Sequence, residues 1–206
     1  TKGSNFTIDS VLFFNAFFDY PLKGKVTDKV LGGVDEESAS YPAFESYNKR
    51  LKIRNIVEGM DYEGGFSMRG SKLQGYGTPE EPAKLTIYRD GYAFLESRSL
   101  NFTIRDDRII SDRVGVTFYL EEDSITHPAL SYKFMKDTRM LTLIRTDEGQ
   151  SKSPYFNSFH MVDMYFEALY WKIDDPMIRF GNLFGSTQNR AAFESFNYFK
   201  MQRYDA

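Results

Sequence analysis

The sequence has 206 residues, of which 41% are hydrophobic and 27% charged, as is typical of folded globular proteins. Lys and Arg number 26 against 29 Asp and Glu, so the net charge of −3 gives no electrostatic basis for binding nucleic acid or an anionic membrane. Cysteine is absent, which excludes disulfides, thiolate metal sites and cysteine nucleophiles. No apolar run approaches the roughly 20 residues of a membrane-spanning helix, so we expect no transmembrane segment.

The first quarter of the chain predicts two strands joined by a long connection. Residues 5–14 and 51–57 are rich in apolar and β-branched residues, which favours strands. The segment 19–50 between them carries three glycines, two prolines and mixed charges, which indicates an irregular connection. Within it, residues 35–40 are expected to form at most one helical turn.

Glycine is concentrated in residues 62–77, at positions 64, 65, 70, 75 and 77, between large side chains. This pattern predicts a bent or bulged hairpin, because glycine permits sharp backbone bends in strands. A phosphate-binding loop would need a helix to follow it. Here Gly77 leads instead into Thr-Pro-Glu-Glu-Pro, so we interpret these glycines as bend positions.

Residues 83–145 alternate between apolar and polar side chains with a period of two, which predicts a meander of antiparallel strands. Asp90-Gly91 between two such runs predicts a type I′ hairpin turn. The alternation also predicts a core, consisting of Leu85, Ile87, Phe94, Leu100, Phe102, Ile104, Val114, Val116, Phe118, Leu141 and Leu143.

The last third of the chain is harder to assign. Residues 161–173 fit either a buried strand or an amphipathic helix, and their Tyr, Phe and Trp content favours the strand. Pro176 ends the segment. Residues 177–180 and 191–198 are expected to be final strands.

Two short motifs recur in the sequence. Ala-Phe-Glu-Ser occurs at 43–46 and 192–195, and Asn-Phe-Thr-Ile at 5–8 and 101–104. The intervals of 149 and 96 residues do not share one short period, so the common repeat families are not supported. Similar local roles in similar strands, or an old duplication, would both explain the recurrence.

The clearest polar constellation is His160 with Asp163 and Glu167. On a helix these side chains would share one face, a spacing that suits a metal site or an acid–base pair. On a strand, His160 would point away from the two carboxylates. We favour the strand and expect no metal or other cofactor. His127 precedes Pro128 in a segment that reads as a turn.

The aromatic fraction of 17% exceeds what one core of this size requires. Tyr119 is expected to face outward from its strand, and Tyr155 and Phe156 lie in a predicted Ser/Pro/Asn loop. Together with Trp171 they are the candidate binding residues, because aromatic side chains offer large, rigid contact surfaces. A second sheet or a neighbouring domain could instead cover them.

Residues 83–145 resemble the repeated strand units of OstA-like and related envelope β-proteins of Gram-negative bacteria. The resemblance lies in LTIYRDGYAFLES at 85–97 and FTIRDDRIISDRVGVTFY at 102–119. The whole chain is also similar to segments of large, uncharacterised Gram-negative envelope proteins. The resemblance implies an elongated, curved sheet with a role in scaffolding or ligand carriage, and it transfers no site residue.

Together these features predict a single all-β domain over 1–206 with little helix, an antiparallel meander forming either a sandwich or jelly roll or an elongated curved sheet. Because the chain starts without Met and ends abruptly, we expect it to be a piece of a larger protein. The leading hypothesis is a non-catalytic structural or ligand-binding domain of an exported envelope or surface protein. It would be periplasmic, outer-membrane-associated or extracellular and would contact flanking domains or other envelope proteins. A carbohydrate-binding module is the first alternative, and a hydrolase with paired carboxylates the second.

Overall fold

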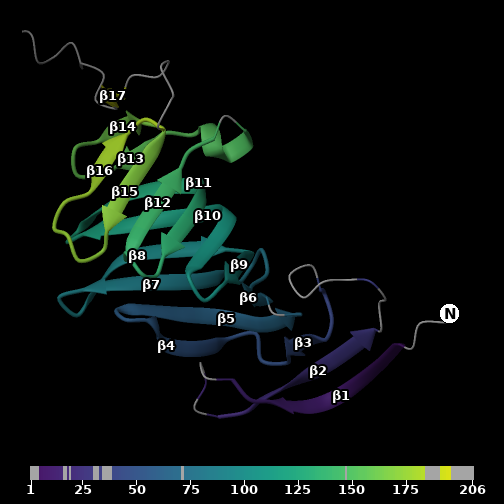
Figure 1. The fold of residues 1–206 in the computed structure, drawn as a ribbon. Helices are drawn as coiled ribbons and strands as arrows, with labels where there is room; N and C mark the ends of the chain where they lie inside the picture. The colour runs from purple at the N-terminus through teal and green to yellow at the C-terminus, as the bar shows by residue number, and fades with distance from the viewer. Residues whose placement is uncertain are drawn as a thin grey trace, which may run out of the picture.

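A computed structural model describes residues 5–15, 18, 20–29, 33, 39–70, 72–146, 148–183 and 191–195. Strands account for 65% of the structure and helix for 2%, so the all-β prediction is confirmed. All 17 described strands belong to one antiparallel sheet (Figure 1). The described helix is a single 3₁₀ turn, η1 (Gly149–Lys152). No described helix has the length and apolar character needed to cross a membrane.

The sheet folds over into two layers because three of its strands bend and contribute a half to each. These shared strands are β5 (Met60–Arg69), β10 (Arg108–Leu120) and β11 (Asp123–Met135). In β5, for example, residues 60–63 pair with β7, whereas residues 67–69 pair with β3. The structure therefore combines the two predicted architectures, since one continuous curved sheet supplies both faces of a sandwich.

The first layer contains the start of β5, the end of β10 and the start of β11. The strands that pair with these halves, and the further strands that pair with those in turn, complete the layer. Its members besides the shared strands are β4 (Leu51–Val57), β7 (Ala83–Arg89), β8 (Tyr92–Ser99), β13 (Tyr155–Asn157), β14 (Val162–Tyr165) and β17 (Ala192–Ser195).

The second layer contains the strands on the other halves of the shared strands. Its members are β1 (Asn5–Phe13), β2 (Leu22–Lys29), β3 (Ala43–Ser46), β6 (Lys72–Tyr76), β9 (Asn101–Ile104), β12 (Met140–Ile144), β15 (Ala168–Lys172) and β16 (Arg179–Gly181). In Figure 1, β12 and β15 cross in front of β8 and β10.

Glycines allow tyrosine rings to lie flat on the sheet where β5 bends. A Cβ added to Gly75 would come within 2.5 Å of the Tyr62 ring, and one added to Gly65 would come equally close to the Tyr76 ring. The Tyr62 hydroxyl donates a hydrogen bond of 2.5 Å to the Gly65 carbonyl. The predicted hairpin is confirmed as β5–β6, and its glycines make room for aromatic rings.

Aromatic side chains fill the space between the layers. The Trp171 ring of β15 lies 4.9 Å from the Phe94 ring of β8 and 6.3 Å from the Phe118 ring of β10, centroid to centroid. Nine of the eleven predicted core residues are buried, and Phe94 is partly buried against the same cluster.

Leu100 was wrongly assigned to the core, since its side chain is 53% exposed. The chain bends at this residue as it passes from β8 to β9. Ser99 occupies the inward position instead, and its hydroxyl lies 2.8 Å from the Ser111 hydroxyl and 2.8 Å from the Arg113 carbonyl oxygen. The inward face changes from odd to even residue numbers across the bend, which simple alternation did not anticipate.

The prediction of a long irregular connection over 19–50 was also wrong in part, because β2 and β3 lie within it. Gly24 takes an inward position of β2 where an apolar side chain would have shown the alternation. A Cβ at this position would lie 2.4 Å from the Phe44 ring, so there is no room for a side chain. The helical turn expected over 35–40 falls mostly outside the described residues.

The segment 161–173 is confirmed as extended, but it forms two strands, β14 and β15, that lie in different layers. The expected final strands are β16 and β17. Residues 196–198 lie outside the described part of the chain.

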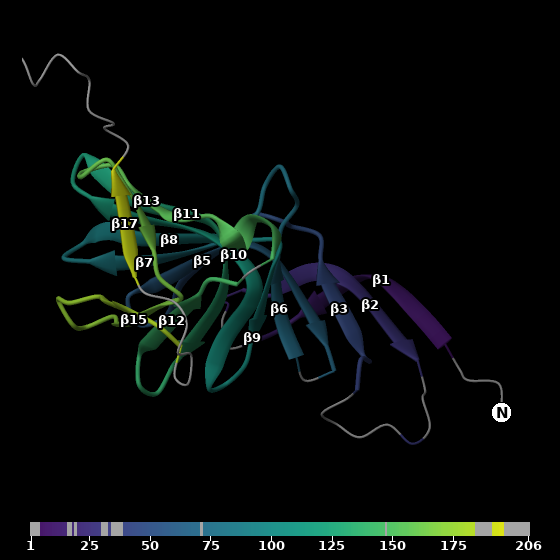
Figure 2. The ribbon, with the colours of Figure 1, turned by 90° about the horizontal axis from the view of Figure 1, so that it is seen from above.

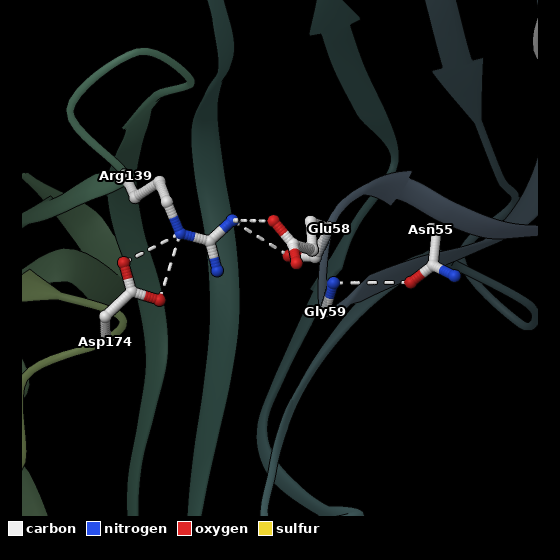
Figure 3. Close-up of polar contacts among 5 residues, drawn as sticks. All are labelled: Asn55, Glu58, Gly59, Arg139 and Asp174. Atoms are coloured by element: carbon white, nitrogen blue, oxygen red, sulfur yellow. Dashed lines mark hydrogen bonds and ion pairs between the residues drawn. The ribbon is translucent and has the colours of Figure 1, made fainter.

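Polar contacts tie the turns of the two layers together (Figure 3). Arg139, in the β11–β12 turn, donates from Nε to both carboxylate oxygens of Asp174, at 2.8 and 3.0 Å. Its Nη1 donates to the Glu58 carbonyl in the β4–β5 turn at 3.0 Å. Hydrogen bonding to Arg139 holds the pKa of Asp174 below its usual value. Arg139 therefore links the β4–β5 turn of the first layer to Asp174, which follows β15 of the second layer.

The Asp90-Gly91 turn has positive φ at both central residues, 52° and 82°, as a type I′ turn requires. Replacing Gly91 with Val should lower the free energy of unfolding by about 1 kcal/mol or more, since a β-branched residue is strained in this region. Urea unfolding will measure the change. Gly181→Val is the matched control, because both glycines have open space around the Cβ position but only Gly91 has a positive φ. Equal effects would contradict the backbone explanation.

Candidate functional site

Two of the four candidate binding aromatics are core residues. Tyr155 is fully buried and stacks on Phe166 with ring centroids 4.2 Å apart. Trp171 is 1% exposed, and its indole N–H donates to the Asp175 carbonyl at 3.0 Å. They do not form an exposed platform, because Trp171 packs against Phe94 and Phe118 of the first layer and Tyr155 packs against Phe166. Phe156 is partly buried in β13, and Tyr119 is 37% exposed.

The polar constellation of His160, Asp163 and Glu167 does not form a metal site. His160 lies in an exposed turn before β14, and Glu167 follows that strand and accepts a hydrogen bond from the Leu183 amide. Asp163 lies opposite Glu194 of β17. Partial desolvation and, to a smaller extent, repulsion from Glu194 raise the pKa of Asp163. Within the described residues, no group of three or more His, Asp or Glu side chains could hold a metal ion.

His127 is buried within the fold rather than placed in a turn. Its Nδ1 accepts a hydrogen bond from the Ala129 amide at 3.1 Å. The proton of the neutral ring is therefore on Nε2, which donates to the Ser153 carbonyl at 2.8 Å. The pKa of His127 is lowered to about 4, mainly by burial. The hydrogen bond to the Ser153 carbonyl opposes this shift, and nearby Arg145 contributes to it. The histidine is a neutral structural element at neutral pH.

Tyr119 lines a cleft beside the β7–β8 and β10–β11 turns, which we call the tip cleft. Its volume is about 770 Å³, and its lining includes Arg89, Tyr92, Phe94, Glu96, Tyr119 and Glu121. Tyr92 is 79% exposed. The Arg89 guanidinium lies 5.4 Å from the centre of the Phe94 ring. The cleft thus offers aromatic surface next to charged groups.

No described strand of the first layer faces the β1–β2 end of the sheet, where the second layer extends beyond the first (Figure 2). The first layer ends at β4, whereas the second continues past β3 into β2 and β1. Among the described residues, β1 pairs only with β2, so its other edge is open. This end carries unpaired backbone groups of the kind that bind additional strands.

The inner face of β1 is apolar and incompletely covered. A bulge at Ser10, where φ is 62°, places Phe6 and Ile8 on the same face as Phe13. Phe13 stacks on Phe44 with ring centroids 4.4 Å apart, so this end of the strand is packed. Phe6 and Ile8 remain 47% and 49% exposed. We call the inner face formed by Phe6, Ile8 and Val26 the open face. The residue types of 5–14 indicated a strand, but not that its apolar side would face no other described strand.

No family model, no curated protein and no solved structure matches this chain. The fold and the described surfaces define its class, which is a two-layered, all-β structure with an open edge at β1.

Proposed function

We propose that this domain is a non-catalytic structural unit of an exported bacterial envelope protein, and that its β1–β2 end assembles with a second copy of the domain. The envelope assignment rests on the resemblance of residues 83–145 to envelope β-proteins. The assembly rests on one observation: a nine-residue edge strand whose apolar inner face is left half exposed at Phe6 and Ile8.

The sequence of β1 suits pairing with a copy of itself. In an antiparallel pair centred on Thr7, Phe6 lies opposite Ile8 of the second copy on the inner face, and this contact occurs twice. Asn5 lies opposite Asp9 of the second copy, so no like charges meet. Edge strands that avoid association usually carry Lys, Pro or inward-facing charges. Residues 5–9 contain none of these, and their inner-face residues Phe6 and Ile8 are apolar.

Replacing Ile8 with Lys should weaken self-association at least tenfold, because it places a charge on the inner face of the paired strands. Sedimentation of the domain over a concentration series will measure the dissociation constant. Leu100→Lys is the matched control, since Leu100 is 53% and Ile8 49% exposed, and Leu100 lies between β8 and β9. A domain that stays monomeric at every concentration, or equal effects of the two variants, would contradict the proposal.

Carbohydrate binding is the second candidate function, and the tip cleft favours it. Of the four candidate aromatic residues, Tyr119 lines this cleft, together with Tyr92, which is more exposed. Glu96 already forms ion pairs with Lys84 and Arg98. Since Tyr155 and Trp171 are buried, this candidate has lost two of its four aromatic residues and ranks below the structural role.

A further inference from the structure

A polar groove crosses the outer face of the second layer, away from both the open face and the tip cleft. Lys25, Glu45, Ser67 and Gln74 lie directly opposite one another on β2, β3, β5 and β6, so they form one row on this face. The groove has a volume of about 540 Å³. This volume lies in the range of about 300–1,000 Å³ common for small-molecule sites.

The groove exists because short side chains lie between long ones. Ala43 is the outward residue between Thr27 and Arg69, which are its partners on the two neighbouring strands. On the other side, the Tyr76 ring lies flat over Gly65 and its hydroxyl donates to the Ser46 carbonyl at 3.0 Å. The short side chains therefore form the floor of the groove, and the Arg69 guanidinium and the Tyr76 ring form its walls.

Tyr41 forms part of the groove lining, and the adjoining chain is fixed to β5. The Gly70 amide donates to the Pro42 carbonyl at 3.0 Å. Gly70 has a φ of 59°, and a Cβ there would lie 2.3 Å from the Ala39 carbonyl oxygen. The segment beside Tyr41 is thus held against the end of β5, which gives the groove a second aromatic side chain in a defined place.

The two cations of the groove are not paired with any acidic side chain in the described part of the chain. Lys25 and Arg69 have no hydrogen-bond or ion-pair partner among the described residues, although Lys25 is directly opposite Glu45. The Glu45 carboxylate instead accepts a hydrogen bond from Tyr76 at 3.4 Å.

The outer face of the first layer is different. There, ion pairs run across the strands from Lys52 to Glu63 at 4.0 Å and from Lys84 to Glu63 at 3.3 Å. They continue to Glu96, which pairs with Arg98 at 2.5 Å. Unlike Lys84 and Arg98 of the first layer, the two cations of the groove have no ion-pair partner among the described residues.

We propose that the groove binds an acidic saccharide, with its carboxylate on Arg69 or Lys25. Arg can hold a carboxylate through two parallel hydrogen bonds. Lys25 and Arg69 are two strands apart and offset by two residues along the strands, about 12 Å between Cα atoms at the usual spacings, a span that neighbouring sugar units can cover. Ser67 and Gln74 supply donors and acceptors for hydroxyl groups, and the two tyrosines supply ring faces. The site does not depend on the assembly through β1.

Titration calorimetry with a tetramer of galacturonic acid tests the proposal, with its fully methyl-esterified form as the neutral counterpart. The wild-type domain should bind the acid at least tenfold more tightly than the ester. Arg69→Gln should lose at least tenfold in affinity for the acid. Arg98→Gln, which removes a guanidinium from the first layer, should bind as the wild type does.

Three results would overturn the assignment: no binding of the acid, equal binding of acid and ester, or equal effects of Arg69→Gln and Arg98→Gln. Both arginines are exposed, so neither variant is expected to impair folding. Binding of the acid that falls with Tyr92→Ala and not with Arg69→Gln would place the ligand in the tip cleft and would also contradict the assignment.

Discussion

Replacing Trp171 with alanine should lower the free energy of unfolding by about 3–5 kcal/mol, the usual cost of removing a large aromatic side chain from a packed core. Trp171 is 1% exposed, contacts Phe94 and Phe118 of the opposite layer, and donates its indole N–H to the Asp175 carbonyl. Its removal leaves a cavity between the layers and an unpaired carbonyl.

Urea unfolding followed by circular dichroism will measure this loss. Tyr119→Ala serves as the control, because Tyr119 was a candidate of the same kind but is 37% exposed, and we expect it to cost less than about 1 kcal/mol. If Trp171→Ala were as mild as Tyr119→Ala, the two layers would not pack on each other at this point.

The stability of the domain should fall as the pH decreases from about 6.5 to about 4, in part because of His127. Burial lowers the pKa of His127 to about 4 in the folded domain, whereas an unfolded chain has a histidine pKa of about 6.5. The unfolded state thus binds more protons in this interval, and the folded state loses stability as the pH falls through it. Above pH 6.5 the contribution is fully present, and its total size is about 3 kcal/mol.

Carboxylates also titrate below pH 5, so the contribution of His127 must be isolated by difference. We expect the pH dependence of His127→Gln to be flatter than that of the wild type between pH 4 and 6.5. His160→Gln is the control, because the other histidine lies in an exposed turn, and its curve should parallel the wild type. Parallel curves for all three proteins would show that His127 is protonated as readily in the folded state as in the unfolded state.

The strands of residues 83–145 could be predicted because each carries a local signal. Alternation along β7, β10 and β12 reflects one buried face, and Asp90-Gly91 supplies the positive φ angles of a type I′ turn. These signals depend on neighbouring residues alone. β2 was missed for the same reason. The Phe44 ring occupies the space that a side chain at position 24 would fill, and Phe44 is twenty residues away in the sequence.

The sites were harder to predict, because alternation separates the two faces of a strand but does not show which face another layer covers. Tyr155 and Trp171 were candidates for an exposed binding surface and are buried, whereas Phe6 and Ile8 lie on an inner face and are half exposed. Both outcomes depend on how far each layer extends, which follows from the pairing of distant strands. The polar groove has the same origin, since Lys25 and Arg69 are brought to one face by the β2–β3–β5 register.

Hydrogen exchange of the β1 amides, measured by mass spectrometry at low and high protein concentration, tests the proposed assembly most directly. We predict that peptides covering residues 5–13 gain protection with concentration in the wild-type domain and in Leu100→Lys, but not in Ile8→Lys. Peptides from β10, at the centre of the sheet, should exchange equally at both concentrations. If the exchange of β1 did not change with concentration, or if protection appeared at β17 instead, the assignment of the β1–β2 end as the assembly surface would be wrong.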